Sequence, residues 1–171
     1  YDVTVICPTG EGTEREQVVD GVRIVAYPAY APGGSAVSYL AEYAQSFQAT
    51  ARLALRERRA GRFDVVQACN PPDIFWPLAR WLRLRDGSRF VFDHHDLCPE
   101  LFRSRFPDGP RMLLRGLLFL ERQTFRAADR VTSTNRSYAD VAVARGGKAP
   151  AEVTVVRTGP DPDRLKRRAP S

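Results

Sequence analysis

Both histidines of the chain are adjacent, at His94 and His95, and they lie between Asp93 and Asp96. An imidazole can donate or exchange a proton near neutral pH, and a neighbouring carboxylate fixes its tautomer. Because successive side chains of a strand point to opposite sides, at most one of the two histidines should face a given pocket. The cluster therefore predicts a histidine that acts on a substrate. Packing of one histidine in the core, against Asp93, is the structural alternative.

The same segment contains atom types that bind zinc, since Cys98 follows closely. The side chains of adjacent histidines diverge, and the sequence has no further histidine to complete a converging set. The cysteines Cys7, Cys69 and Cys98 form no C-x-x-C pair, and their odd number and wide spacing are typical of a reduced, cytosolic chain. We therefore expect no metal centre.

Other polar segments follow predicted strands at residues 8–12, 70–73, 134–137 and 157–161. In an open parallel sheet, ligands bind beyond the carboxyl ends of the strands. The Gly-rich segment at 10–12 lacks the third glycine of a dinucleotide-binding loop and precedes a hairpin, which favours a plain turn. The predicted substrate contacts are Asn70, Asp73, His94, Glu100, Asn135, Thr158 and Gly159.

The elements that would position these residues alternate along the chain. Short apolar runs predict strands at residues 2–7, 63–69, 89–92, 130–133 and 152–156. Helical periodicity predicts helices over residues 35–59, from the turn at 70–73 to residue 82, and over 110–128 and 137–145, with a short helix or irregular segment at 97–107. Asp20-Gly21 between two apolar runs predicts a β-hairpin. The alternation from residue 63 indicates an α/β fold: a Rossmann-like three-layer domain with a mostly parallel sheet.

The length of 171 residues corresponds to one domain, expected over residues 1–160, followed by a basic tail at 161–171. The sequence contains no run of about 18 apolar residues, so no transmembrane helix is predicted. The net charge of +6 is carried mostly by arginine. No RNA-binding aromatic signature or helix-turn-helix pattern accompanies it, so phosphorylated ligands and anionic membranes are favoured over nucleic acid.

The predicted helix at 110–128 has an unusual distribution of charge. Its four arginines, Arg111, Arg115, Arg122 and Arg126, fall within about 60° of one another at helical spacing, and much of the remaining circumference is apolar. A membrane-facing surface with an arginine rim is one interpretation. Burial against a neighbouring helix or another domain is the other, and we favour it slightly on sequence alone.

Six segments, in this order, resemble the N-terminal domain of family 4 glycosyltransferases: VTVICPTGEG, VVDGVRIVAYP, FDVVQACNPPD, FVFDHHDLCPE, LERQTFRAADRVTSTNRSY and VTVVRTGPD. The resemblance covers nearly all of the chain. It implies one half of a GT-B fold, in which the N-terminal domain binds mainly the acceptor and a C-terminal domain binds the nucleotide-sugar donor. The family needs no catalytic metal or other cofactor. The paired-glutamate E-x(7)-E motif of the donor domain has no match here, so the chain is expected to be the acceptor-side half.

The resemblance also assigns roles to individual residues. His95-Asp96 matches the family's active-site histidine, so His95 would hydrogen-bond the sugar or the reacting region and Asp96 would orient it. Glu100 would brace the following loop. The family's closing Pro-Asn-Gly-Val-Asp turn is replaced by residues 157–161, which leaves the role of this turn undefined.

The expected activity of the intact enzyme is retaining transfer of a sugar, of the hexosyltransferase type, to a hydroxyl group. The acceptor would be a sugar, a lipid-linked molecule or a small molecule. The enzyme would be cytoplasmic or peripheral at the inner face of the membrane, and the isolated chain would be inactive. Two alternatives remain: a non-enzymatic flavodoxin-like binding module that docks through the loops at 70–73 and 93–96, and a GT-B sugar-nucleotide epimerase.

The family domain normally begins with a strand, a loop and a helix that have no counterpart in this sequence. That strand would lie between the strands at residues 2–7 and 63–69. We expect this segment to exist in the native polypeptide outside this sequence. Without it, the chain would self-associate or accept a strand from a partner through the unpaired edges, or the two strands would close up and pair directly with each other.

Overall fold

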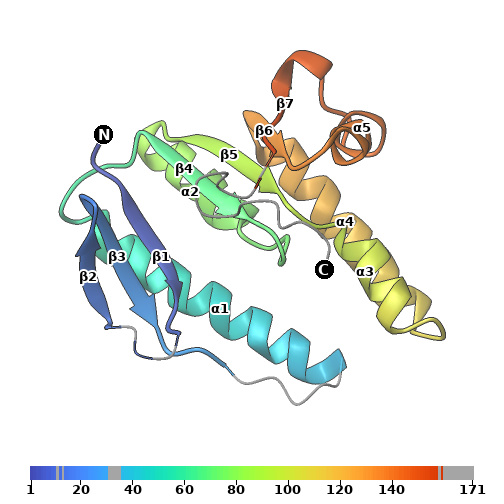
Figure 1. Cartoon of the computed structure of the whole chain (residues 1–171), viewed down its shortest axis with the longest axis horizontal. Helices are drawn as coiled ribbons and strands as arrows, with labels where there is room; N and C mark the ends of the chain where they lie inside the picture. The colour runs from blue at the N-terminus through green and yellow to red at the C-terminus, as the bar shows by residue number, and fades with distance from the viewer. Residues whose placement is uncertain (11, 13, 31–35, 158, 160–171) are drawn as a thin grey trace, which may run out of the picture. The chain divides into compact units, whose positions relative to one another are not determined.

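The computed structural model of the protein describes residues 1–10, 12, 14–30, 36–157 and 159 (Figure 1). The chain divides into two compact units. The first unit contains Tyr1–Val66 and Ile74–Arg89, and the second contains Gln67–Asp73 together with the residues from Phe90 onward. The predicted tail at 161–171 lies outside the described residues, as does the predicted start of the first helix at residue 35.

The first unit contains a three-stranded sheet of order β1-β3-β2. Strand β1 (Thr4–Pro8) pairs in parallel with β3 (Val22–Tyr27), and β2 (Glu16–Val19) pairs with β3 in the antiparallel sense. Asp20 and Gly21 connect β2 to β3 with φ angles of 51° and 80°. Two consecutive positive φ angles match the two-residue hairpin turn that an Asp-Gly pair favours, so the predicted hairpin is confirmed.

Two helices complete the first unit. Helix α1 (Ala36–Glu57) contacts β1 and β3, and helix α2 (Trp76–Asp86) buries Leu82. Gly87 ends α2 in the left-handed conformation that favours glycine, with a φ of 78°. The Arg58 guanidinium donates two hydrogen bonds of 2.6 Å to the Asp86 carboxylate, which connects the C-terminal ends of the two helices.

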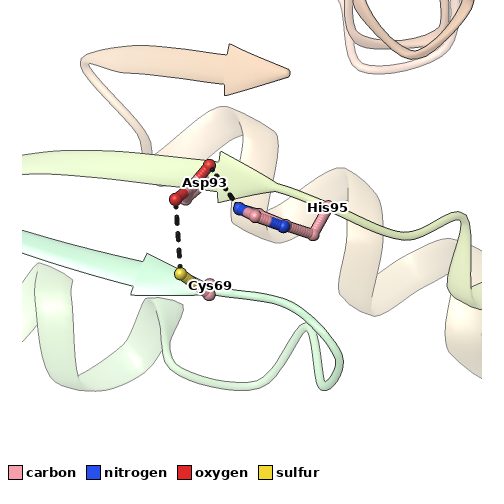
Figure 2. Close-up of side chains that lie close together, drawn as sticks. All are labelled: Cys69, Asp93 and His95. Carbon is pink, nitrogen blue, oxygen red and sulfur yellow. Dashed lines mark hydrogen bonds and ion pairs between the residues drawn. The ribbon is translucent and has the colours of Figure 1, made fainter. Parts of the chain in front are cut away.

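A second sheet has the order β4-β5-β6-β7. Its strands are β4 (Val65–Cys69), β5 (Arg89–His94), β6 (Arg130–Ser133) and β7 (Val153–Val155). β5, β6 and β7 pair in parallel, and Figure 2 shows β4 and β5 running in the same direction. The prediction of a parallel sheet from residue 63 onward is therefore confirmed. The strands form two sheets, and β1 pairs with β3 in the first of them.

The described part of the second unit contains the helices α3 (Cys98–Arg105), α4 (Arg111–Ala127) and α5 (Arg136–Ala144). Helix α4 buries Phe125 completely, and the Phe125 ring meets Phe92 of β5 edge to face at 5.2 Å. A short 3-10 turn at Pro150–Glu152 leads into β7. Strands that alternate with helices around this apolar core form the predicted Rossmann-like α/β arrangement.

Candidate functional site

The two adjacent histidines point to opposite sides at the carboxyl end of β5. His94 is the last residue of the strand and is 0% exposed, whereas the side chain of His95, which follows it, is 43% exposed. Strand alternation therefore separates the two rings as predicted. His95 is the histidine that solvent or a ligand can reach.

His94 lies among aromatic side chains in the core of the second unit. Its ring centroid is 5.1 Å from that of Phe125 and 5.5 Å from those of Phe92 and Tyr138. Burial, assisted by the positive charge of Arg145, lowers the pKa of His94 to about 4, so the ring is neutral at pH 7. The predicted substrate contact of His94 is not supported, because the ring has no exposed surface.

The carboxylate of Asp93 connects His95 to two neighbouring strands. Its Oδ1 lies 3.2 Å from Nε2 of His95 and accepts a 2.7 Å hydrogen bond from the Thr132 hydroxyl on β6. Its Oδ2 accepts hydrogen bonds from Gln67 at 3.0 Å and from the Cys69 thiol at 3.3 Å, both on β4. Figure 2 shows the Cys69, Asp93 and His95 side chains converging at the ends of β4 and β5.

The surroundings of Asp93 favour its charged form. Burial alone would raise its pKa, but the hydrogen bonds from Thr132 and Cys69, together with the charge interaction and hydrogen bond with His95, outweigh burial and hold the pKa of Asp93 below its usual value. An ionised carboxylate beside Nε2 favours the tautomer that carries its proton on Nε2. In the neutral ring, Nδ1 of His95 is then the hydrogen-bond acceptor.

This geometry corrects the residue predicted to orient His95. The carboxylate that the structure places against the ring is Asp93, two residues before His95 on the same side of the chain, and not Asp96. Asp96 contributes backbone groups instead: its N–H and its carbonyl both bond to the Asn70 side chain. Sequence reasoning also missed Thr132, although it is the residue that pairs with Asp93 in the register of β5 and β6.

Asn70 is a buried brace for the loop that carries His95. Its Oδ1 accepts hydrogen bonds from the backbone N–H groups of His95 (2.7 Å) and Asp96 (3.1 Å), and its Nδ2 donates to the Asp96 carbonyl at 2.6 Å. Nδ2 also lies 3.2 Å from Oδ1 of Asp73. Asn70 and Asp73 are each 4% exposed. Both side chains are therefore buried and stabilise the loop. Their burial argues against the direct substrate contacts predicted for these two residues.

Glu100 joins α3 to the end of α5. Its two carboxylate oxygens accept hydrogen bonds from Arg145, which follows the last residue of α5. Arg145 also donates a 2.7 Å hydrogen bond to Glu121 of α4, whose side chain is 1% exposed. The network connects three helices through one guanidinium and is compatible with the bracing role expected for Glu100. Arg145 was not predicted from the sequence.

The remaining predicted contacts are Asn135, Thr158 and Gly159. Asn135 caps α5, because its Oδ1 accepts a 3.0 Å hydrogen bond from the Tyr138 N–H. Gly159 is exposed. Thr158 lies outside the described residues. The histidine site is therefore built mainly from the ends of β4, β5 and β6.

The same site brings three potential metal ligands together. One ligand atom each from Cys69, Asp93 and His95 lies within 4.8 Å of the others. Partial burial, together with the Asp93 carboxylate, raises the pKa of Cys69 to about 11, so the thiol keeps its proton and donates a hydrogen bond to Asp93. A metal ion would have to displace that proton and replace the contacts that these side chains already make.

Comparison with known proteins agrees with this architecture. A search of curated proteins found no match to the chain. The family model described as a glycosyl transferase 4-like domain matches residues 1–159, which is nearly the whole chain. A match of this extent, on an α/β fold with a parallel four-stranded sheet, shows that the chain belongs to the glycosyl transferase 4-like domain family.

Proposed function

We propose that this chain is the acceptor-side half of a retaining glycosyltransferase. The enzyme transfers a sugar, as a hexosyltransferase does, from a nucleotide-sugar donor to a hydroxyl group of a sugar, a lipid-linked molecule or a small molecule. A second domain supplies the donor site, and the reaction takes place in the cytoplasm. The observation that carries the proposal is an exposed imidazole, His95, held at the carboxyl end of a parallel strand by an ionised carboxylate.

His95 acts as a positioned hydrogen-bonding group. The Asp93 carboxylate contacts Nε2 of the ring, and the Asn70 side chain hydrogen-bonds to the backbone of residues 95 and 96. Fixing both the side chain and the backbone reduces the freedom that the ring would lose on binding a sugar. Orientation of this kind is a large source of catalysis, worth up to about 7–11 kcal/mol when both reactants are held in attack geometry.

Asp93 is a positioning residue in this account, because it acts on the substrate through His95. Its replacement by asparagine keeps the shape of the side chain and removes the charge that selects the tautomer of His95. The tautomer can be measured from the ¹⁵N chemical shifts of the ring. We expect Asp93→Asn to shift them and Asp96→Asn to leave them unchanged, because only Asp93 contacts the ring.

The activity is tested with the intact enzyme, which includes the donor domain. Release of nucleoside diphosphate is measured with a panel of sugar nucleotides, with and without candidate hydroxyl acceptors, and the anomeric configuration of the product is determined by NMR. The proposal predicts acceptor-dependent release and retained configuration. Inversion at the anomeric carbon would refute the retaining mechanism. A change in the donor sugar without transfer would instead indicate an epimerase.

A further inference from the structure

Helix α4 exposes a face that combines positive charge with apolar surface. The exposed residues on it recur at helical spacing over the whole helix, and they are Arg111, Met112, Arg115, Gly116, Phe119, Arg122 and Arg126. Met112 is 72% exposed and Phe119 is 55% exposed. The opposite side of the helix buries Glu121, Thr124, Phe125 and Ala127. The structure therefore shows that the core of the second unit covers one side of α4 and leaves the other open.

The arrangement of the exposed face is regular. At about 100° per residue, the four arginines fall within about 60°, and Phe119 and Met112 occupy about the next 40°. From Arg111 to Arg126 the arginine stripe is about 22 Å long, at about 1.5 Å per residue. One helix thus presents a row of guanidinium groups directly beside two large apolar side chains.

In the part of the chain that the structure describes, no carboxylate pairs with the arginines of this face. The only acidic residue of α4 is Glu121, which is buried and pairs with Arg145. Among the residues that the structure describes, no acidic side chain forms an ion pair with any of the four arginines. The surface is therefore complementary to an anionic partner along its whole length.

We propose that this face of α4 docks on the anionic surface of a lipid bilayer. Guanidinium groups bind lipid phosphates through paired hydrogen bonds, and Phe119 and Met112 can enter the boundary between headgroups and acyl chains. A purely polar polyanion would satisfy the arginines but would leave both apolar side chains in water, so a lipid surface accounts for more of the face. No helix among the described residues is long and apolar enough to cross a membrane. The proposal is independent of the chemistry assigned to His95.

Vesicle sedimentation tests the proposal with the 171-residue chain. Vesicles of phosphatidylcholine alone are compared with vesicles that contain phosphatidylglycerol at about one lipid in three. We expect binding to the anionic vesicles only, and release by salt. Arg115→Gln with Arg122→Gln should lower the partition coefficient roughly 25-fold, at about fivefold for each arginine near the surface. Phe119→Ser should lower it about tenfold, because an apolar side chain no longer enters the interface.

The matched control removes the same charge elsewhere in the second unit. Arg130→Gln with Arg136→Gln changes two exposed arginines outside α4 and should reduce binding less than about threefold. Far-UV circular dichroism verifies that each variant is folded. Lack of binding to anionic vesicles, or an equal loss in the control, would overturn the proposal. Tight binding to heparin or duplex DNA, unaffected by Phe119→Ser and without vesicle binding, would show that the partner is a polyanion and not a membrane.

Discussion

Replacement of Asn70 by alanine should destabilise the second unit strongly for a single polar substitution. The side chain is 4% exposed and makes three hydrogen bonds to the backbone of residues 95 and 96. At about 1 kcal/mol of net stability for each bond, Asn70→Ala should lower the free energy of unfolding by about 3 kcal/mol. Alanine cannot replace these bonds, and the buried groups it leaves unpaired would increase the loss.

Asn135 provides a matched control for this substitution. Its side chain accepts one hydrogen bond from the backbone, at the start of α5, and loss of such a cap typically costs about 1 kcal/mol. Urea titrations followed by far-UV circular dichroism would compare Asn70→Ala with Asn135→Ala, provided that the urea dependence of both variants is unchanged. Equal losses in the two variants would refute the brace assigned to Asn70.

Four further substitutions test the packing and the buried titratable groups by urea unfolding. Gly146→Ala would place a Cβ atom 2.5 Å from a backbone oxygen and 2.6 Å from the Phe125 ring, so it should lower the free energy of unfolding by about 1–3 kcal/mol. Gly116→Ala is the control: its Cβ atom meets no atom within 4 Å, so the substitution should be neutral or stabilising. Burial lowers the pKa of His94 to about 4, so between pH 6.5 and pH 4 the unfolded chain binds a proton that the folded chain does not. The free energy of unfolding should therefore fall by up to about 3 kcal/mol as the pH drops through this range, and His94→Phe should remove this loss. Burial raises the pKa of Asp73 to about 6, so the free energy of unfolding of the native chain falls as the pH rises from 4 to 6. Asp73→Asn removes this fall, so the variant should gain about 2–3 kcal/mol of stability relative to the native chain over that range. An unchanged pH profile in either variant would contradict the burial of that group.

Local patterns in the sequence were enough to predict several parts of this structure. The Asp20-Gly21 pair specifies its hairpin because two consecutive positive φ angles select few residue types. The separation of His94 from His95 follows from the two-residue repeat of a strand, which does not depend on the rest of the fold. The parallel sheet follows from the alternation of strands and helices.

The partners within the site depend on the register between strands, which local patterns do not determine. Asp93 meets Thr132 because β5 and β6 align these two residues, which are 39 positions apart in the chain. The same reasoning explains why Cys69 and Gln67 were not predicted as neighbours of Asp93. Asn70 was misassigned for a different reason. A polar residue at the end of a strand has the same sequence signature whether it contacts a ligand or braces a loop, and only its burial distinguishes the two roles.

The central claim is that His95 serves sugar transfer and that Asp93 positions it. The most direct test measures kcat/KM for transfer by the intact enzyme in His95→Ala, Asp93→Asn and Asp96→Asn. We predict a loss of roughly 10²–10⁴-fold for His95→Ala. We expect a loss of about 10–100-fold for Asp93→Asn, by analogy with the carboxylates that orient metal-binding histidines. Asp96→Asn should change turnover less than about threefold, since its backbone and not its carboxylate makes the contacts to the loop brace. Unchanged turnover in His95→Ala would remove this histidine from the mechanism. A greater loss in Asp96→Asn than in Asp93→Asn would show that the orienting carboxylate is Asp96 after all.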